Sequence, residues 1–533
     1  MRSIFVPVVA FVLVGLCWMV TSPPGVGVDE PSHYIRIVGM ANGQFFGRSV
    51  PADRPLSGLT GAQLERVNAE SGAFDLPGNQ REPLPCNVFE PTMPFACAQY
   101  PVVAGTAEHV SFHAKYLPGA YVLPAVLARF GSSMWRTVLL ARIGFLIQNT
   151  VLFAVTLLAL RRRRAAGRSV GFGRSAWALL ALSVTPLVAF QVGTIAPSAT
   201  EVLGVAAFTA ALGAVAVAPR PWRWVALGCG VMACWARDLG VVGVGLAAVA
   251  WAVADPGMRR WWRERTRADV IAAAALAVAA LGAVVWQLTM KVALRPRPGP
   301  LAELWRDLGV VPSLLHQSVG LLGWLNYRLD PFVDAVWSTA WVALLFVVLS
   351  QLDRRTRWVF AGLGFVYVAL NLVLIDGLRA TGFGVQPRFT LSVVAVAVVL
   401  LAARASRGTG APAAAGAVAE GVEIETASDR SRDAAGGSRW FASSVAVVVA
   451  AGHVSALVIS AHRHANGLGT GAISFDQPAW SPPGGWNAAM VLFALAAALI
   501  VVPIVVPAAA SAISETRADA RSRSSAGSPR TDP

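Results

Sequence analysis

Residues 136–164 read RTVLLARIGFLIQNTVLFAVTLLALRRRR, an apolar run that ends in four consecutive arginines. About 20 apolar residues are enough for a helix to cross the hydrocarbon core of a bilayer. Arginines directly after such a helix favour the cytoplasmic side of the membrane. The stretch therefore predicts a transmembrane helix that runs from Arg136 to Leu160 and ends in the cytoplasm.

Comparable apolar runs recur along the chain, so that twelve spans are expected. They lie near residues 3–21, 136–160, 175–192, 198–218, 222–236, 239–254, 268–290, 331–350, 357–375, 388–404, 440–460 and 487–509. Composition agrees, because 55% of the residues are hydrophobic and only 14% are charged, whereas soluble proteins carry about 25% charged residues. The sequence predicts an all-α polytopic membrane protein.

The arginine clusters give the spans a consistent orientation. Those at 161–164, 220–223, 259–267 and 354–357 all fall on one side if the N-terminus is cytoplasmic. No small-residue cleavage site follows the first run, so it predicts a span and not a signal peptide. We expect a multi-pass protein of the cytoplasmic membrane with both termini in the cytoplasm.

Six segments follow from this topology. They are a first span (1–21), an extracytoplasmic loop with an interfacial helix near 116–130 (22–135), a transmembrane core (136–404), a disordered cytoplasmic linker (405–439), a C-terminal hairpin of two spans (440–509) and a disordered tail (510–533). The linker and tail are predicted to be disordered because they carry Ala, Gly, Ser and charge without periodicity.

The net charge and the cysteines of the sequence bear on three questions, namely a nucleic-acid partner, a disulfide and a zinc site. The formal net charge of +15 comes from arginines between the apolar runs, which is how orientation signals are placed, so no nucleic-acid partner is expected. Cys86 and Cys97 lie in the long external loop, where an oxidising compartment would permit a disulfide. The sequence contains no Cys-x-x-Cys pair and no cysteine and histidine cluster with the spacing of a zinc site, so no metal site is predicted from it.

Unusual polar residues collect on the predicted external face. They are Asp29, Glu30, His33 and Arg36 after the first span, His113, Lys115 and Tyr116 before the interfacial segment, Arg142 in the second span, Glu201 between the third and fourth spans, Arg237 and Asp238 between the fifth and sixth, and Asp376, Arg379, Gln386 and Arg388 around the outer end of the tenth. Charge near membrane depth is costly and marks function or structural pairing. Because these residues share one face, they favour an outward-facing site over an ion path through the bilayer.

The adjacent carboxylates Asp29 and Glu30 are the candidate catalytic residues. Either could act as a general base, and together they could hold a divalent cation; no cofactor is otherwise indicated. The alternatives are solvated loop charges, or an Asp29 that caps the following helix with Glu30 in its first turn. His33 and Arg36 lie about one helical turn later, on the same expected face.

The external arginines are candidate phosphate ligands, because a guanidinium can bind phosphate oxygens bidentately. Arg388 is the preferred one, with Arg142 and Lys115 as companions. The alternative for each arginine is snorkelling to lipid headgroups. Glu201 has the alternative of a structural pair with a neighbouring arginine.

Five motifs in this order resemble an uncharacterised family of bacterial polytopic membrane proteins, from about Val28 to Trp486. The motifs are Asp-Glu-Pro-x-His from Asp29, His-x-Lys-Tyr-x-Pro from His113, Pro-Ser-x-x-Glu from Pro197, Gly-Val-Gln-x-Arg-Phe from Gly384 and Trp-x-Pro-Pro-Gly from Trp480. That family in turn resembles the C-type (GT-C) glycosyltransferases. The sequence departs from the pattern at Pro387 and Phe389, where glycine and tyrosine are more usual.

The resemblance implies a sugar donor carried on polyprenyl phosphate, an acidic residue at Asp29 or Glu30, and arginines that contact the lipid phosphate. We therefore expect an inverting membrane glycosyltransferase with a cell-envelope glycan or lipid as acceptor and membrane lipids as surroundings. Two other classes stay open. One is a transporter or flippase of a lipid-linked envelope precursor, and the other is a non-catalytic membrane scaffold.

Overall fold

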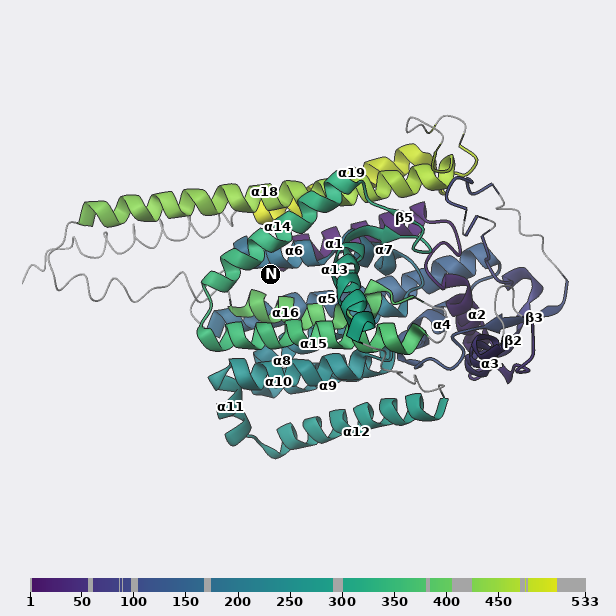
Figure 1. Cartoon of the computed structure of the whole chain (residues 1–533), viewed down its shortest axis with the longest axis horizontal. Coiled ribbons are helices and arrows are strands. Elements are labelled where there is room, and N and C mark those ends of the chain that lie inside the picture. Colours follow the sequence, from purple (N-terminus) through teal and green to yellow (C-terminus); the bar gives the residue numbers. More distant parts are fainter. Residues whose placement is uncertain are drawn as a thin grey trace, which may run out of the picture.

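The computed structural model describes residues 2–55, 61–85, 87–88, 90–96, 104–166, 174–290, 301–379, 384–404, 424–469, 475 and 478–505. Within these ranges the chain is mostly helical. Long helices run side by side in a bundle, and a small mixed domain closes one end of it (Figure 1). We call this end the loop end. The predicted fold class, a polytopic helical membrane protein, is confirmed.

The bundle consists of α1 (Arg2–Thr21), α5 (Met134–Ala166), α6 (Arg174–Ser183), α7 (Pro186–Gly193), α8 (Pro197–Val215), α9 (Pro219–Ala236), α10 (Gly240–Ala254), α11 (Pro256–Arg263), α12 (Arg267–Met290), α13 (Leu301–Gly320), α14 (Pro331–Ser350), α15 (Arg354–Arg379), α16 (Leu391–Arg404), α18 (Ile424–Ala465) and α19 (Gly485–Val505). Every apolar run that was predicted to span the membrane overlaps one or two of these helices. Helix α13 was not predicted.

Eight helices of the described chain are long and apolar enough to cross a membrane, or up to ten if each of two bent pairs is one span. The pairs are α6–α7, bent by 57°, and α10–α11, bent by 99°. Each second helix begins with a proline, Pro186 or Pro256, which cannot continue the hydrogen bonding of the preceding helix. Twelve spans therefore stays a prediction, since α16 has only 14 residues.

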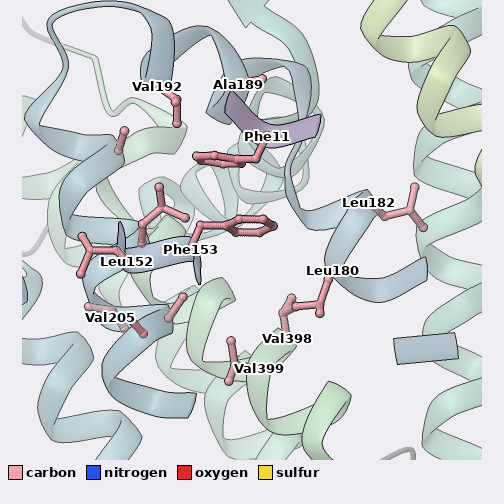
Figure 2. Close-up of a cluster of buried hydrophobic side chains, with 14 of the residues drawn as sticks. Phe11, Leu152, Phe153, Leu180, Leu182, Ala189, Val192, Val205, Val398 and Val399 are labelled. Atoms are coloured by element: carbon pink, nitrogen blue, oxygen red, sulfur yellow. The ribbon is translucent and has the colours of Figure 1, made fainter. Parts of the chain in front are cut away.

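Helix α8 lies at the centre of the bundle, and 94% of its apolar membrane-spanning stretch is buried. It packs on α5, α9, α10 and α16, and its many alanines and glycines let the neighbouring backbones approach closely. Elsewhere in the same core, Phe11 of α1 stacks on Phe153 of α5 with ring centroids 4.4 Å apart (Figure 2). These contacts fix α1 and α5 together, and both helices lead into the loop end.

The loop end consists of α2 (Glu30–Ala41), β1 (Arg48–Ser49), α3 (Gly61–Glu70), β2 (Gly72–Pro77), η1 (Gly78–Gln80), β3 (Thr106–Ser111), η2 (Gly119–Tyr121) and α4 (Val122–Ala128). The strands form an antiparallel sheet in the order β1-β2-β3. Phe74 and Leu76 of β2 are buried together with Tyr34 and Val38 of α2. A second pair, β4 (Leu321–Leu322) and β5 (Tyr327–Arg328), and η3 (Pro387–Phe389) lie in later connections.

Three details differ from the sequence prediction. The all-α prediction missed the small sheet, because its two outer strands, β1 and β3, are too short or too polar to show the alternation of apolar and polar residues that marks a strand. The interfacial segment predicted near 116–130 contains a shorter helix, α4, which buries Ala125 and exposes Val126. Residues 424–439 of the predicted disordered linker belong to α18; residues 405–423 and the tail from 510 lie outside the described residues.

Candidate active site at the loop end

Asp29 adopts a backbone conformation that few non-glycine residues take. It precedes α2 in the left-handed region, with φ 60° and ψ 10°, and its side chain makes no capping hydrogen bond to that helix. Asp29 thus occupies the N-cap position with Glu30 in the first turn, as the alternative predicted, but its side chain does not cap the helix. Strained backbone of this kind persists only where the surroundings enforce it, and it is concentrated at functional sites.

Arg388 meets this carboxylate from the other end of the sequence. Its guanidinium donates to Oδ2 of Asp29 and, over 3.3 Å, to the carbonyl of Val28. The Arg388 side chain is 6% exposed and the Asp29 side chain 27%. The ion pair thus leaves the carboxylate, and not the guanidinium, as the part that solvent reaches.

Arg237, in the connection between α9 and α10, is a second buried cation at this site. Its guanidinium lies 4.7 Å from the ring centroid of Phe389, the neighbour of Arg388. Burial opposes ionisation of Asp29, but the charges of Arg388, His113 and Arg237 outweigh it and lower the pKa of the carboxyl group. Asp29 is therefore ionised at neutral pH and can accept a proton.

Two histidines complete the surroundings of Asp29. His33 and His113 lie with ring centroids 4.2 Å apart, and Nε2 of His113 is 3.7 Å from Oδ2 of Asp29. Nδ1 of His33 is hydrogen bonded to the hydroxyl of Tyr121 at 2.9 Å, and Nδ1 of His113 to that of Ser32 at 2.8 Å. Burial, followed by the nearby positive charges, lowers the pKa of His33 well below its usual value, so its ring is neutral at pH 7.

Arg36 positions this pair and lies too deep to meet a substrate. It is fully buried, donates to the carbonyl of His113 at 2.6 Å, and lies 4.5 Å from the ring centroid of Tyr121. Of the four residues predicted to share one face, Asp29, Glu30, His33 and Arg36, the last two both contact Tyr121, whereas Glu30 binds Arg142 instead. Arg36 fixes the segment that carries His113.

Tyr116 and Glu201 lie near His113 and Arg237 of this site, and Gln386 lies two residues before Arg388. The Tyr116 ring is 4.5 Å from that of His113. Glu201 of α8 is buried. Burial of Arg237 by itself would lower the pKa of its guanidinium, but Tyr116, Glu201 and the neighbouring carboxylates outweigh the effect of burial and raise that pKa. Gln386 directly precedes η3 and is half-buried. Arg388, Arg237, His33 and His113 thus surround Asp29, with Tyr116 against His113 and Glu201 acting on Arg237.

Glu30 and Arg142 form a different, wholly internal pair. Arg142 donates to both carboxylate oxygens of Glu30, at 2.8 and 2.9 Å, and the side chains are 0% and 3% exposed. Glu30 also accepts the backbone N–H groups of Gly27 and Ile195, each at 3.0 Å. Glu30 was predicted as a base or cation ligand, and Arg142 as a phosphate ligand. The structure corrects both predictions, because the polar atoms of the two side chains are already hydrogen bonded inside the protein.

Lys115 and the two loop cysteines do not add to the site. The ammonium of Lys115 donates to the carbonyl of Ala69 at the end of α3, so it points away from Asp29, contrary to its predicted role. Cys86 and Cys97 lie outside the described residues, and their disulfide stays a prediction.

Sequence reasoning placed Arg237 among the polar residues of the external face without making it a site candidate, and it missed Tyr121 and Ser32. Arg237 had a signal, since an arginine between two apolar runs is costly at membrane depth. Tyr121 and Ser32 had none, because a hydroxyl in a loop or a helix start is ordinary until its partner is known.

The family model of DUF2142, described as a predicted membrane protein, matches residues 11–398. The chain belongs to this family. The match covers most of the DUF2142 chain and includes Asp29, His113, Arg237 and Arg388. No curated protein matches it.

Two solved structures of ArnT from Cupriavidus metallidurans are similar to this DUF2142 chain at 16% sequence identity. The apo structure has a TM-score of 0.40 and covers 93% of this chain and 77% of its own. The structure bound to undecaprenyl phosphate has a TM-score of 0.41, with 94% and 77% covered.

Proposed function

We propose that this protein is a membrane glycosyltransferase that moves a sugar from a polyprenyl-phosphate donor to a cell-envelope glycan or lipid acceptor, at the outer face of the cytoplasmic membrane. The observation that carries the proposal is the Asp29 carboxylate, ionised, part-exposed and held in a left-handed turn against Arg388. It is placed to take a proton from an acceptor hydroxyl.

Arg388 and Arg237 are suited to the phosphate of the donor. Both are buried guanidinium groups beside the carboxylate, and planar guanidinium forks bind phosphate oxygens bidentately. Preorganised positive charge in a water-poor site stabilises negative charge that develops on a leaving group. We assign them to the departing polyprenyl phosphate.

An apolar cavity beginning at Leu391, three residues after Arg388, supports a lipid-linked donor. It has a volume of about 400 Å³ and lies between α13, α14, α15 and α16, with Leu391, Val394, Ala397 and Leu401 of α16 along one wall. The eleven residues of helix from Leu391 to Leu401 extend about 15 Å, at 1.5 Å for each of the ten steps between them. An aliphatic chain could lie along this wall while its phosphate contacts Arg388.

The distribution of charge supports the orientation. Helix α11, with Arg259, Arg260 and Arg263, lies at the end of the bundle opposite α2 and the sheet (Figure 1). Arginine-rich connections are retained in the cytoplasm. The end that carries Asp29 is then extracytoplasmic, where envelope acceptors are found.

In the proposed step the acceptor oxygen attacks the anomeric carbon as its proton passes to Asp29. The bond between that carbon and the phosphate oxygen breaks, and the electron pair leaves with the polyprenyl phosphate beside Arg388 and Arg237. A single displacement of this kind inverts the anomeric configuration. Atoms and charge balance without another reactant.

The test is transfer by the full chain in lipid, from labelled polyprenyl-phosphate sugars to envelope glycan acceptors. Asp29→Asn should lower kcat by about 10²–10⁴-fold, the usual contribution of a general base. Asp53→Asn is the matched control, because it removes a carboxylate from an exposed position of the same loop. Equal kcat in wild type and a folded Asp29→Asn variant would rule out Asp29 as the base; tight donor binding without turnover would favour the transporter.

A further inference from the structure

Asp29 lies in a group with His33 and His113, two histidines to which the transfer step gives no role. Each offers one ligand atom, and the three atoms lie within 4.8 Å of one another. Nε2 of His113 and Oδ2 of Asp29 are 3.7 Å apart. Ligands at about 2.0–2.1 Å in a tetrahedral zinc site are about 3.4 Å from each other, so the His113–Asp29 distance is close to what one ion requires, and a shift of the ligand atoms by about 1 Å or less would bring all three into range.

Hydrogen bonds on the far side of each imidazole fix its orientation. The hydroxyls of Tyr121 and Ser32 occupy Nδ1 of His33 and His113. Each hydroxyl can accept a proton from Nδ1 or donate one to it; in the neutral tautomer in which Nδ1–H donates, Nε2 carries the lone pair, and in His113 Nε2 is the atom that faces Asp29. Metal-binding histidines in proteins almost always have such a partner on the second nitrogen.

The group is also rigid, because separate elements are tied together at it. Ser111 at the end of β3 donates to the carbonyl of Ser32 at 2.7 Å, and Arg36 holds the carbonyl of His113. These contacts join the start of α2 to the segment after β3. Ligands held by locked neighbours need little rearrangement to close on an ion.

We propose that Asp29, His33 and His113 bind one divalent transition-metal ion of the zinc class. Two imidazole nitrogens and one carboxylate oxygen suit Zn²⁺ and related ions, whereas Mg²⁺ and Ca²⁺ prefer oxygen ligands alone. Three protein ligands also leave a coordination position for a substrate oxygen. Arg388 contacts Oδ2 of Asp29, and the other carboxylate oxygen and remaining lone pairs can still accept a metal ion.

Ion binding does not depend on the transfer reaction, but its use in catalysis rests on the proposed function. An ion at this point would lie beside the carboxylate and near the two guanidinium groups. A metal-bound acceptor hydroxyl loses its proton more readily than a free one. The ion would therefore assist deprotonation at Asp29.

The experiment measures metal content of the purified full chain after incubation with Zn²⁺ and removal of unbound ion. We expect about one Zn²⁺ per chain for wild type and the control His109→Gln, and at least a tenfold loss for His33→Gln/His113→Gln. His109 lies on β3 beside Glu82 and is outside the group. Excess Mg²⁺ should not displace the zinc. Wild type without stoichiometric zinc, or a folded double variant that retains it, would overturn the proposal.

A second variant covers failure of the double variant to fold. His113→Cys keeps a ligand at the site, and Co²⁺ bound to it should show a thiolate-to-metal charge-transfer band that wild type lacks. A folded His113→Cys protein without this band would refute the site. Zinc binding without sugar transfer would contradict only the proposed function, and transfer by metal-free protein would contradict only the catalytic use of the ion.

Discussion

Replacing Arg142 by methionine should lower the free energy of unfolding by about 3–5 kcal/mol, the usual cost of leaving one partner of a buried ion pair alone. All five N–H groups of Arg142 donate hydrogen bonds. Two go to Glu30 and three to the carbonyls of Met19, Ser22 and Pro23 at the end of α1. Arg142→Met leaves Glu30 charged and fully buried, and it strips those three carbonyls of this donor.

The double variant Glu30→Gln/Arg142→Met should recover more than half of the loss. It removes the unpaired charge, and the glutamine amide oxygen can still accept from the N–H groups of Gly27 and Ile195. Charge-free replacements of buried ion pairs are often neutral in stability. The remaining loss of stability is the cost of leaving the carbonyls of Met19, Ser22 and Pro23 without the hydrogen bonds that Arg142 donated.

The assay is unfolding of the detergent-solubilised protein in mixed micelles, followed by tryptophan fluorescence, since buried Trp18 directly precedes Met19. Asp29→Asn is the comparison, because it changes the adjacent carboxylate and should leave stability within about 1–2 kcal/mol while it abolishes transfer. An Arg142→Met variant as stable as wild type, or a double variant no better than the single one, would refute this reasoning.

Two further predictions concern the donor cavity and the sheet. Ala397→Phe fills the cavity beside α16 and should raise KM for the lipid donor about tenfold, which corresponds to about 1.4 kcal/mol of binding free energy. The control Ala248→Phe fills a separate apolar cavity near α11 and should leave KM unchanged. Equal KM values for the two variants would argue against a lipid chain at α16. Arg48 contacts Asp75 and Glu108, and these contacts lower the pKa of both carboxyl groups from 3.8 and 4.5. Their stabilisation is present above the ordinary values and is lost as the pH falls through the lowered ones, so Arg48→Gln should speed proteolysis of the loop at neutral pH but not in acid; a pH-independent difference would contradict this.

The sequence determined the class of the protein, because spanning a bilayer depends on local properties. Run length and the asymmetry of arginines act within single segments, and each predicted run contains a helix. The motif residues Asp29, His113 and Arg388 could be nominated in the same way, since each is a polar residue at the edge of an apolar run.

Only the tertiary structure decided which nominees act together. Asp29 and Glu30 are adjacent and chemically alike, so no local pattern separates them. The left-handed turn at Asp29 sends one carboxylate to Arg388, and the packing of α1, α2 and α5 seals the other against Arg142. Contacts between residues hundreds of positions apart depend on how the helices pack, and that is why the partners of each charge could not be predicted from the sequence.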